Sequence, residues 1–169
     1  MKNISSLTKF RLIGMACLVF CFAVSCHHTG SFTQKNTATV KDSVLKMVEG
    51  IAKDISQEGP AAWLRYFEHT PEFFMASQGQ LVFPNNDSAT NFIKNVLVKN
   101  IKQIELRWAN IRIDPLSSEF ANTAANFHED LTDVSGKTIS EDGYFTGIAE
   151  RTSQGWQLRN AHWSTTEKK

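Results

Sequence analysis

The stretch 155–164, Gly-Trp-Gln-Leu-Arg-Asn-Ala-His-Trp-Ser, constrains the fold more than any other part of the sequence. It follows a turn at residues 152–155 and is rich in strand-forming residues, so it is predicted to be the last strand of a sheet. Side chains alternate along a strand, so one face is predicted to carry Trp156, Leu158, Asn160, His162 and Ser164. That face is apolar at its start and polar at its end, as expected of a strand that crosses a core and then lines a cavity.

Longer alternating segments precede this strand and predict an antiparallel sheet. The apolar alternation changes phase between Trp108 and Ile111, which indicates a bulge, and bulges bend sheets. Residues 120–131 have one clearly more apolar face, expected to point inward. That face carries Ala121, Thr123, Ala125, Phe127, Glu129 and Leu131. A turn at residues 133–136 then leads to a further strand around residues 144–151.

Three helices and a hairpin are predicted before the long strands. Thr39 is expected to cap a first helix, which has an apolar stripe at helical spacing and ends at Gly59. Pro60 begins a shorter helix. Its aromatic residues include Trp63 and Phe67. They either fill the core, which is the more common role of such residues, or form the wall of a pocket.

A hairpin over residues 73–83 is expected next, and then a third helix capped by Asn86 or Asp87. Helices followed by a bent antiparallel sheet predict an α+β domain, with the helices packed on the concave face of the sheet.

The N-terminus has the layout of a secretory signal peptide. A positively charged segment holds Lys2, Lys9 and Arg11, and an uncharged segment of 13 residues, 12–24, follows it. A helix needs about 20 apolar residues to span a bilayer, so this segment is too short for a transmembrane helix. Residues 1–25 are therefore expected to be a signal peptide.

The sequence Ala-Val-Ser-Cys that ends at Cys26 resembles a bacterial lipobox, in which a small residue precedes the cysteine that is acylated. Cys17 and Cys21 are rival positions. However, Cys21 follows the bulky Phe20, and Cys17 would leave a very short apolar segment. The alternative is an ordinary cleaved signal with an incidental cysteine. We predict a lipoprotein that is anchored in the bacterial envelope through Cys26 and faces the periplasm.

All three cysteines lie at or before position 26, so the mature domain has no disulfide and depends on its core. Removal of the signal peptide leaves 15 basic against 17 acidic residues, a net charge of −2. This composition offers no basic surface for nucleic acid, so no nucleic-acid partner is expected. Membrane attachment would come from the lipid and not from charge.

Residues 26–39 are expected to form a flexible tether, because they are polar and rich in Ser, Thr and Asn. The adjacent His27 and His28 could bind a metal ion. Two neighbouring histidines without further ligands are a weak signal, so no metal or other cofactor is predicted. The folded domain would then cover residues 40–166.

The order of these elements resembles that of the nuclear transport factor 2-like superfamily, which includes ketosteroid isomerase-like and SnoaL-like proteins. The likeness covers residues 40–165. It is most specific in Gly155-Trp156, followed by His162 and Ser164, and in the turn at residues 133–136 before Tyr144. The resemblance implies a cone, in which a curved antiparallel sheet wraps around the N-terminal helices and encloses a pocket at the wide end. It also implies possible homodimers through the sheet.

The resemblance does not fix a chemistry, because the superfamily includes isomerases, cyclases, hydrolases, dehydratases and association domains. Steroid isomerase-like members use an aspartate base with a tyrosine and a protonated aspartate as oxyanion donors. Epoxide hydrolase-like members use an Asp-Arg-Asp set. Neither set can be placed on the predicted inner faces of this sequence.

His162 and Glu129 remain as candidate catalytic residues. The ordinary pKa of histidine suits proton transfer at neutral pH, so His162 could be a general base, with Ser164 as its partner. The alternative, which we favour, is a histidine that holds the pocket floor through hydrogen bonds. An inward Glu129 would have a raised pKa and be a functional candidate. Its neighbours His128 and Asp130 should point to the opposite face, so a metal site is not expected here.

These observations predict a lipid-anchored domain that binds a small, largely apolar molecule in an aromatic-lined pocket. The predicted pocket residues are Trp63, Phe67, Trp108, Phe127, Tyr144, Asn160, His162 and Ser164. Two alternatives stay open. One is an enzyme of the isomerase or dehydratase type with His162 or Glu129 as base. The other is a non-catalytic association module that dimerises through its sheet; a filled interior would favour it.

Lipidation can be tested at Cys26. Expressed with its own signal peptide, the wild-type protein should fractionate with membranes and incorporate labelled fatty acid. The Cys26→Ser variant should do neither, because it lacks the acylated thiol. Equal incorporation of label into both proteins would contradict the prediction.

Overall fold

The structure is a computed structural model and describes residues 33–166. The predicted signal peptide, Cys26, the histidine pair at 27 and 28 and the first part of the predicted tether lie outside the described residues. Within residues 33–166, no helix combines the length and apolar character needed to cross a membrane.

The first helix, α2 (Gln34–Glu58), begins earlier than the sequence predicts. Thr33 is its N-cap, with its hydroxyl accepting from the amide of Asn36 at 3.3 Å, and Thr39 lies inside the helix. The prediction that Thr39 caps the helix is wrong, and residues 34–39 are helical where a tether was expected. These residues are mostly polar and largely exposed, so the sequence shows no apolar stripe before Val40. From Val40 onward the predicted stripe is buried as expected.

Gly59 ends α2 as predicted, with a φ of 85° that an L side chain rarely adopts. The next element, η1 (Pro60–Arg65), is a 3-10 helix. It is fixed to α2 by the hydroxyl of Tyr66, which donates to Asp54 Oδ2 at 2.7 Å. Burial and this hydrogen bond raise the pKa of Tyr66 to about 12. The link sets the side of α2 from which Trp63 of η1 reaches the interior.

A hairpin of β1 (Phe74–Ser77) and β2 (Gln80–Phe83) follows, as predicted. Gln78 and Gly79 form its turn, both with positive φ. A continuous helical segment then runs through α3 (Asn86–Phe92), η2 (Ile93–Leu97) and α4 (Val98–Asn100), of which η2 has π-helical geometry. Its cap is Asn85, which forms a capping box with Ser88, so the prediction of Asn86 or Asp87 is wrong by one or two residues.

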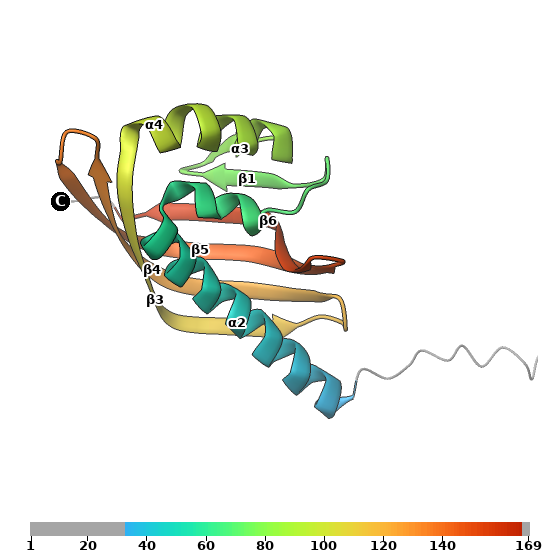
Figure 1. The fold of residues 1–169 in the computed structure, drawn as a ribbon. Coiled ribbons are helices and arrows are strands. Elements are labelled where there is room, and N and C mark those ends of the chain that lie inside the picture. The colour runs from blue at the N-terminus through green and yellow to red at the C-terminus, as the bar shows by residue number, and fades with distance from the viewer. Residues whose placement is uncertain (1–32, 167–169) are drawn as a thin grey trace, which may run out of the picture. The chain divides into compact units, whose positions relative to one another are not determined.

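The remaining strands form one sheet with the hairpin. They are β3 (Ile101–Pro115), β4 (Phe120–Asp133), β5 (Thr138–Thr152) and β6 (Gly155–Thr165). The strand order is β2-β1-β6-β5-β4-β3 (Figure 1). All neighbouring pairs are antiparallel except β1 and β6, which are parallel. The sheet is therefore mixed, and the prediction of a purely antiparallel sheet is wrong at this one pair.

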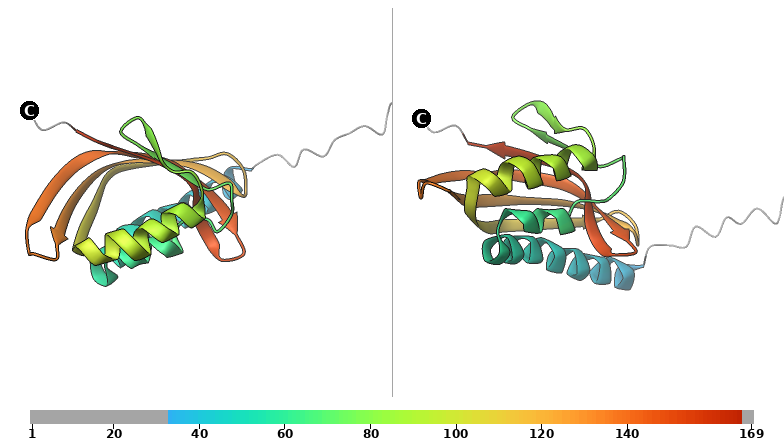
Figure 2. Two further views of the ribbon diagram at one scale, coloured as in Figure 1. Left: turned by 90° about the horizontal axis from the view of Figure 1, so that it is seen from above. Right: turned by 45° about the horizontal axis from the view of Figure 1, so that its top comes forward.

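The sheet is strongly curved and does not close into a barrel (Figure 2). Its register shifts in β3 between Ala109 and Arg112, where Asn110 has a φ of 52°. This bulge lies where the change of phase in the sequence predicted one. The helices lie on the concave face (Figure 2), and the predicted fold class, an α+β domain with a curved sheet wrapped around helices, is confirmed.

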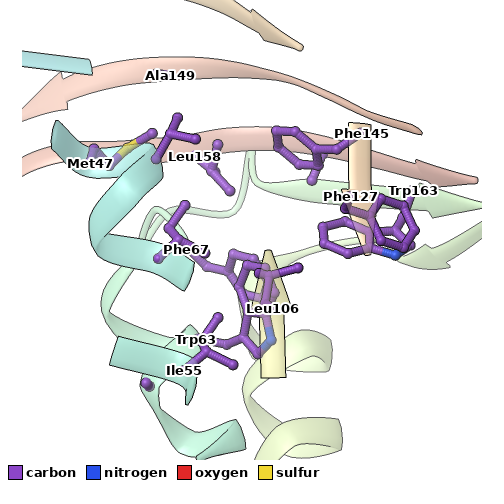
Figure 3. Packing of buried hydrophobic residues seen from close by; sticks show 14 of the residues in the cluster. Met47, Ile55, Trp63, Phe67, Leu106, Phe127, Phe145, Ala149, Leu158 and Trp163 are labelled. Carbon is purple, nitrogen blue, oxygen red and sulfur yellow. The ribbon is translucent and has the colours of Figure 1, made fainter. Parts of the chain in front are cut away.

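The core fills the space between α2 and the concave face of the sheet. Trp108 joins the two layers, because its indole N–H donates to the carbonyl of Val48 at 2.8 Å. The predicted inner face of β4 is confirmed, since Ala121, Thr123, Ala125, Phe127 and Glu129 are all buried. Figure 3 shows the aromatic residues of this core converging from η1, β4, β5 and β6.

Candidate functional site

A cavity of about 640 Å³ lies between the hairpin, the helical segment α3–η2 and the concave face of the sheet. Its walls come from η1, β1, β2, α3, η2, β3, β4 and β6. The lining residues are Trp63, Phe67, Met75, Ser77, Gln80, Leu81, Val82, Phe83, Phe92, Ile93, Leu97, Ile104, Glu129, Leu131 and Trp163. Most of these side chains are apolar, and five are aromatic. This composition is typical of pockets for small molecules.

The hairpin and the helical segment form the more exposed side of this cavity. Leu81 is 60% exposed and Phe92 is 38% exposed, although both line the cavity. Phe92 packs against Phe83 of β2, with ring centroids 5.3 Å apart. Ile93 is buried, and Leu97 is half-buried one turn later. Val96, in the same helical segment, is 44% exposed and does not line the cavity.

Trp163 is the centre of the aromatic cluster beneath the cavity. Its ring lies 4.2 Å from that of Phe127 and 5.8 Å from that of Trp63, measured between centroids. Trp108 and Phe145 contact it at 5.6 and 5.5 Å. Figure 3 shows Trp163 beside Phe127, with Trp63 and Phe67 reaching in from the helical side. Aromatic contacts of this kind fix ring orientation as well as burying area, so they define how the rings lie in this cavity wall.

The absence of a side chain at Gly143 makes room for this cluster. A Cβ atom there would lie 2.1 Å from the carbonyl oxygen of Ser164 and 2.5 Å from the ring of Phe127. Both atoms belong to the strands that flank β5, so neither can move away easily. Gly143 therefore lets the ring of Phe127 lie across β5 towards Trp163.

Glu129 is the one ionisable side chain among the described residues that line the cavity. It lies on β4 between Phe127 and Leu131 on the same face, and the residue as a whole is buried, with 8% of its surface exposed. Burial raises the pKa of Glu129 to about 7, and the negative charge of Glu141 on β5 adds to the shift. No hydrogen bond or ion pair with residues 33–166 contributes to that pKa. The sequence-based prediction of an inward carboxyl with a raised pKa agrees with this placement.

His162 does not reach the cavity. The register between β5 and β6 shifts so that Ile148 pairs with Asn160 and Ala149 with Leu158, which leaves Arg159 as an extra residue in β6. This bulge reverses the alternation, since a shift of one residue moves following side chains to the other face. The prediction that His162 shares the inner face with Leu158 is wrong.

The same bulge moves other predicted pocket residues to the outer face. Asn160 and Ser164 alternate with the buried Ala161 and Trp163, and His162 is exposed. Tyr144 pairs with Ser164 on that outer face and is 43% exposed. Tyr144, Asn160, His162 and Ser164 are therefore brought together on the convex side of the sheet, away from the cavity.

Four of the predicted pocket residues lie on the inner side. Trp63 and Phe67 line the cavity, while Trp108 and Phe127 stand behind its wall in contact with Trp163. Sequence reasoning missed Trp163 itself, along with the residues of the hairpin and of η2. The apolar pair Ala161 and Trp163 could have indicated which face of the end of β6 points inward. The prediction instead placed the polar residues of the same strand in the cavity.

The neighbours of Glu129 on β4 point outward, as predicted. His128 Nδ1 lies 2.7 Å from Asp142 Oδ1, and Arg107 donates to Asp130 at 2.7 Å. The hydrogen bond with Asp142 raises the pKa of His128. Among the residues that the structure describes, no group of three or more His, Cys, Asp or Glu side chains is arranged to hold a metal ion.

Comparison with known proteins identifies relatives by structure alone. No family model and no curated protein matches the sequence. Among solved structures, a nuclear transport factor 2-like superfamily protein from Salmonella enterica serovar Typhimurium superposes with a TM-score of 0.66 at 18% identity, covering 78% of this chain and 94% of that one.

Two further solved structures from Novosphingobium carry the names of enzymes. A provisionally assigned scytalone dehydratase from Novosphingobium aromaticivorans gives a TM-score of 0.68 at 11% identity, over 80% of this chain and 89% of that one. Hexachlorocyclohexane dehydrochlorinase LinA-type3 from Novosphingobium barchaimii gives 0.63 at 10% identity, over 80% and 92% of the two chains. At these identities the likeness establishes the fold and not an activity.

The raised pKa of Glu129 predicts a pH-dependent stability. Because the folded state holds this proton more tightly than the unfolded state, the wild-type domain loses stability as pH rises from 4.5 towards 7. A shift of this size corresponds to about 3 kcal/mol. We therefore expect Glu129→Gln to exceed wild type by up to that amount at pH 8, and by much less at pH 4.5.

Urea unfolding of both proteins between pH 4.5 and 8 measures this difference. Glu119→Gln is the control, since Glu119 is an exposed residue and its variant should follow wild type across the range. A difference between Glu129→Gln and wild type that does not change with pH would contradict the predicted titration.

Proposed function

Because the described domain has the fold of the nuclear transport factor 2-like superfamily, we propose that it is a small-molecule-binding domain held at the bacterial cell envelope by a lipid on Cys26. The ligand would be small and largely apolar. The observation that carries this proposal is the cavity itself, which is lined mainly by apolar and aromatic side chains and contains a single carboxyl group.

The size and lining of the cavity support ligand binding over simple core packing. Its volume of about 640 Å³ lies within the range of pockets that hold drug-sized molecules, about 300–1,000 Å³. The pocket is partly open to solvent, so its apolar lining is left in contact with water. Exposure of apolar surface costs free energy, which a ligand that covers the lining would recover.

The same cavity argues against a purely structural association module, since a filled interior was the feature expected of one. A homodimer through the sheet remains a prediction that comes from the resemblance. Such a dimer would use the convex face, where Tyr144, Asn160, His162 and Ser164 lie together. Binding in the cavity and pairing through the convex face use different surfaces and are compatible with each other.

The envelope location rests on the N-terminal sequence. The positively charged segment, the short apolar segment and the lipobox-like residues before Cys26 support it. In that location the domain would meet apolar molecules that partition from membranes, and a protein without a basic surface would depend on its lipid for attachment.

One observation favours a second candidate function, an enzyme that abstracts a proton. Glu129 is a buried carboxyl beside the cavity with a pKa of about 7, so it is well matched to general base catalysis near neutral pH. Two structural relatives carry the names of a dehydratase and a dehydrochlorinase, and these names motivate tests with dehydratable or dehydrohalogenatable compounds. His162 no longer serves as the base, because it is exposed on the other face.

If Glu129 is a catalytic base, turnover should rise with pH towards a plateau above about 7. Glu129→Gln should stay folded and bind substrate, but it should lose turnover by on the order of a hundredfold or more. His162→Asn is the control and should retain wild-type turnover. Equal turnover by Glu129→Gln and wild type would exclude this candidate.

Ligand binding in the cavity can be tested with a neutral apolar dye, N-phenyl-1-naphthylamine. The wild-type protein should bind one equivalent with saturable fluorescence enhancement. Leu97→Trp replaces a small aliphatic side chain of the lining with a large indole ring. It should weaken binding at least about tenfold, since a filled site excludes the dye. Leu116→Trp changes a 60% exposed side chain that does not line the cavity and should bind like wild type. Equal loss of binding in both variants would contradict binding in the cavity.

A further inference from the structure

The charge distribution inside the cavity restricts which apolar ligands it can take. Of the described lining residues, only Glu129 can be ionised, and Lys, Arg and His are absent from that lining. The other polar side chains of the lining are Ser77 and Gln80, both uncharged. The interior is therefore neutral or negative and never positive. A ligand with a carboxylate or phosphate group would bring a second negative charge into an apolar space without a partner, which is costly.

The carboxyl group of Glu129 lacks a partner from the protein. It accepts no hydrogen bond that stabilises its charge, and the nearest ionised group with an effect on it is another carboxylate, Glu141. A buried carboxylate in this position is destabilised until a positive charge arrives. The described residues that line the cavity include no Lys, Arg or His, so a positive charge beside Glu129 would have to come with a ligand.

We propose that the cavity selects an apolar monoamine, with the ammonium group bound to the carboxylate of Glu129 and the apolar body held against the aromatic wall. This inference rests on the proposed ligand-binding function and specifies its ligand class. It follows from the geometry of an isolated buried carboxylate within an otherwise uncharged cavity.

The aromatic residues of the cavity lining suit the same ligand class. Trp63, Phe67, Phe83, Phe92 and Trp163 all line the cavity. Ring faces attract ammonium groups through their quadrupoles, and tryptophan does so most strongly. A cation bound at Glu129 therefore has a counter-charge and aromatic surfaces available in the same space, whereas an anion has neither.

The binding of an amine should depend on the protonation of Glu129. Glu141 on β5 is the charged group that faces Glu129 across the sheet, and η1, β1, β2, α3, η2, β3 and β6 contribute only uncharged side chains to the lining. A primary amine stays protonated from pH 5.5 to 8. Affinity for the amine should therefore increase over this range as Glu129 loses its proton, while affinity for a neutral analogue should stay constant.

Three ligands that differ only in their end group test the inference. These are 6-phenylhexylamine, 6-phenylhexan-1-ol and 6-phenylhexanoate, measured by isothermal titration calorimetry with the mature protein carrying Cys26→Ser. At pH 8 we expect the amine to bind on the order of tenfold or more tightly than the alcohol, as a charge-assisted hydrogen bond provides. The carboxylate should bind more weakly than the alcohol. At pH 5.5 the preference for the amine should fall at least threefold.

Two variants identify the group responsible. Glu129→Gln keeps the size of the side chain and should remove the preference for the amine while leaving affinity for the alcohol within about threefold of wild type. Glu141→Gln should keep the preference, because Glu141 does not line the cavity. Urea unfolding confirms that both variants are folded.

The outcomes separate this inference from the function on which it rests. If all three ligands bind with similar affinity, or if the amine preference survives Glu129→Gln, ligand binding stands and selection of an amine is overturned. If none of the three binds and the neutral dye does not bind either, the proposed function itself is overturned. If the preference for the amine is lost in Glu129→Gln and kept in Glu141→Gln, the result supports both ligand binding in the cavity and selection of an amine.

Discussion

The bends of the sheet are the constraint on which the rest of the structure depends. A flat sheet would present one face to the helices and leave no enclosed space, whereas a curved one can pack α2 along part of its concave face and keep a cavity at another part. Two bulges contribute to this curvature, one at Asn110 in β3 and one at Arg159 in β6. Glycine at position 143 makes room on the concave face, because a side chain there would clash with the ring of Phe127.

The bulge at Arg159 also has an electrostatic basis. The extra residue is an arginine whose guanidinium lies 2.5 Å from Glu150 and 3.7 Å from the buried Glu68. The backbone amide of Glu68 in turn donates a hydrogen bond to the carbonyl of Leu158 at 2.9 Å. Glu150 on β5 and Glu68 after η1 thus hold the side chain of Arg159. The bulge at Arg159 leaves Ala161 and Trp163 pointing inward.

Glu129 lowers the stability of this domain, because burial disfavours the charged form of its carboxyl group. A leucine or glutamine in its place would avoid the burial of a carboxylate, and residues 33–166 contain no cysteine and hence no disulfide to compensate for the cost. Residues that reduce stability at a cavity are commonly those that act on a ligand. The position of this carboxyl within an otherwise uncharged lining supports the same interpretation for Glu129.

The sequence predicted the fold well where apolar residues marked the faces of the elements. The stripe of α2, the inner face of β4 with Glu129 and the bulge near Asn110 all followed from alternation or helical spacing. The predictions failed where polar residues carried the pattern. Gln34 to Thr39 gave no apolar stripe, and the bulge at Arg159 was hidden because Asn160 and His162 are acceptable on either face. Trp163 offered the opposite phase, but only the contacts of the folded chain decide between the two.

The place of the hairpin in the strand order has a consequence for how the proposed ligand would enter and leave the cavity. β1 and β2 lie at the edge of the sheet, each four residues long, and β1 is joined to β6 over only four residue pairs. Their side chains are half-buried or exposed, so few apolar contacts hold them compared with the long inner strands. The hairpin side of the cavity is therefore held by fewer residue pairs than the side that carries Glu129 and Trp163. If a ligand binds there as proposed, its exit would require displacement of this short edge hairpin and not of the main core.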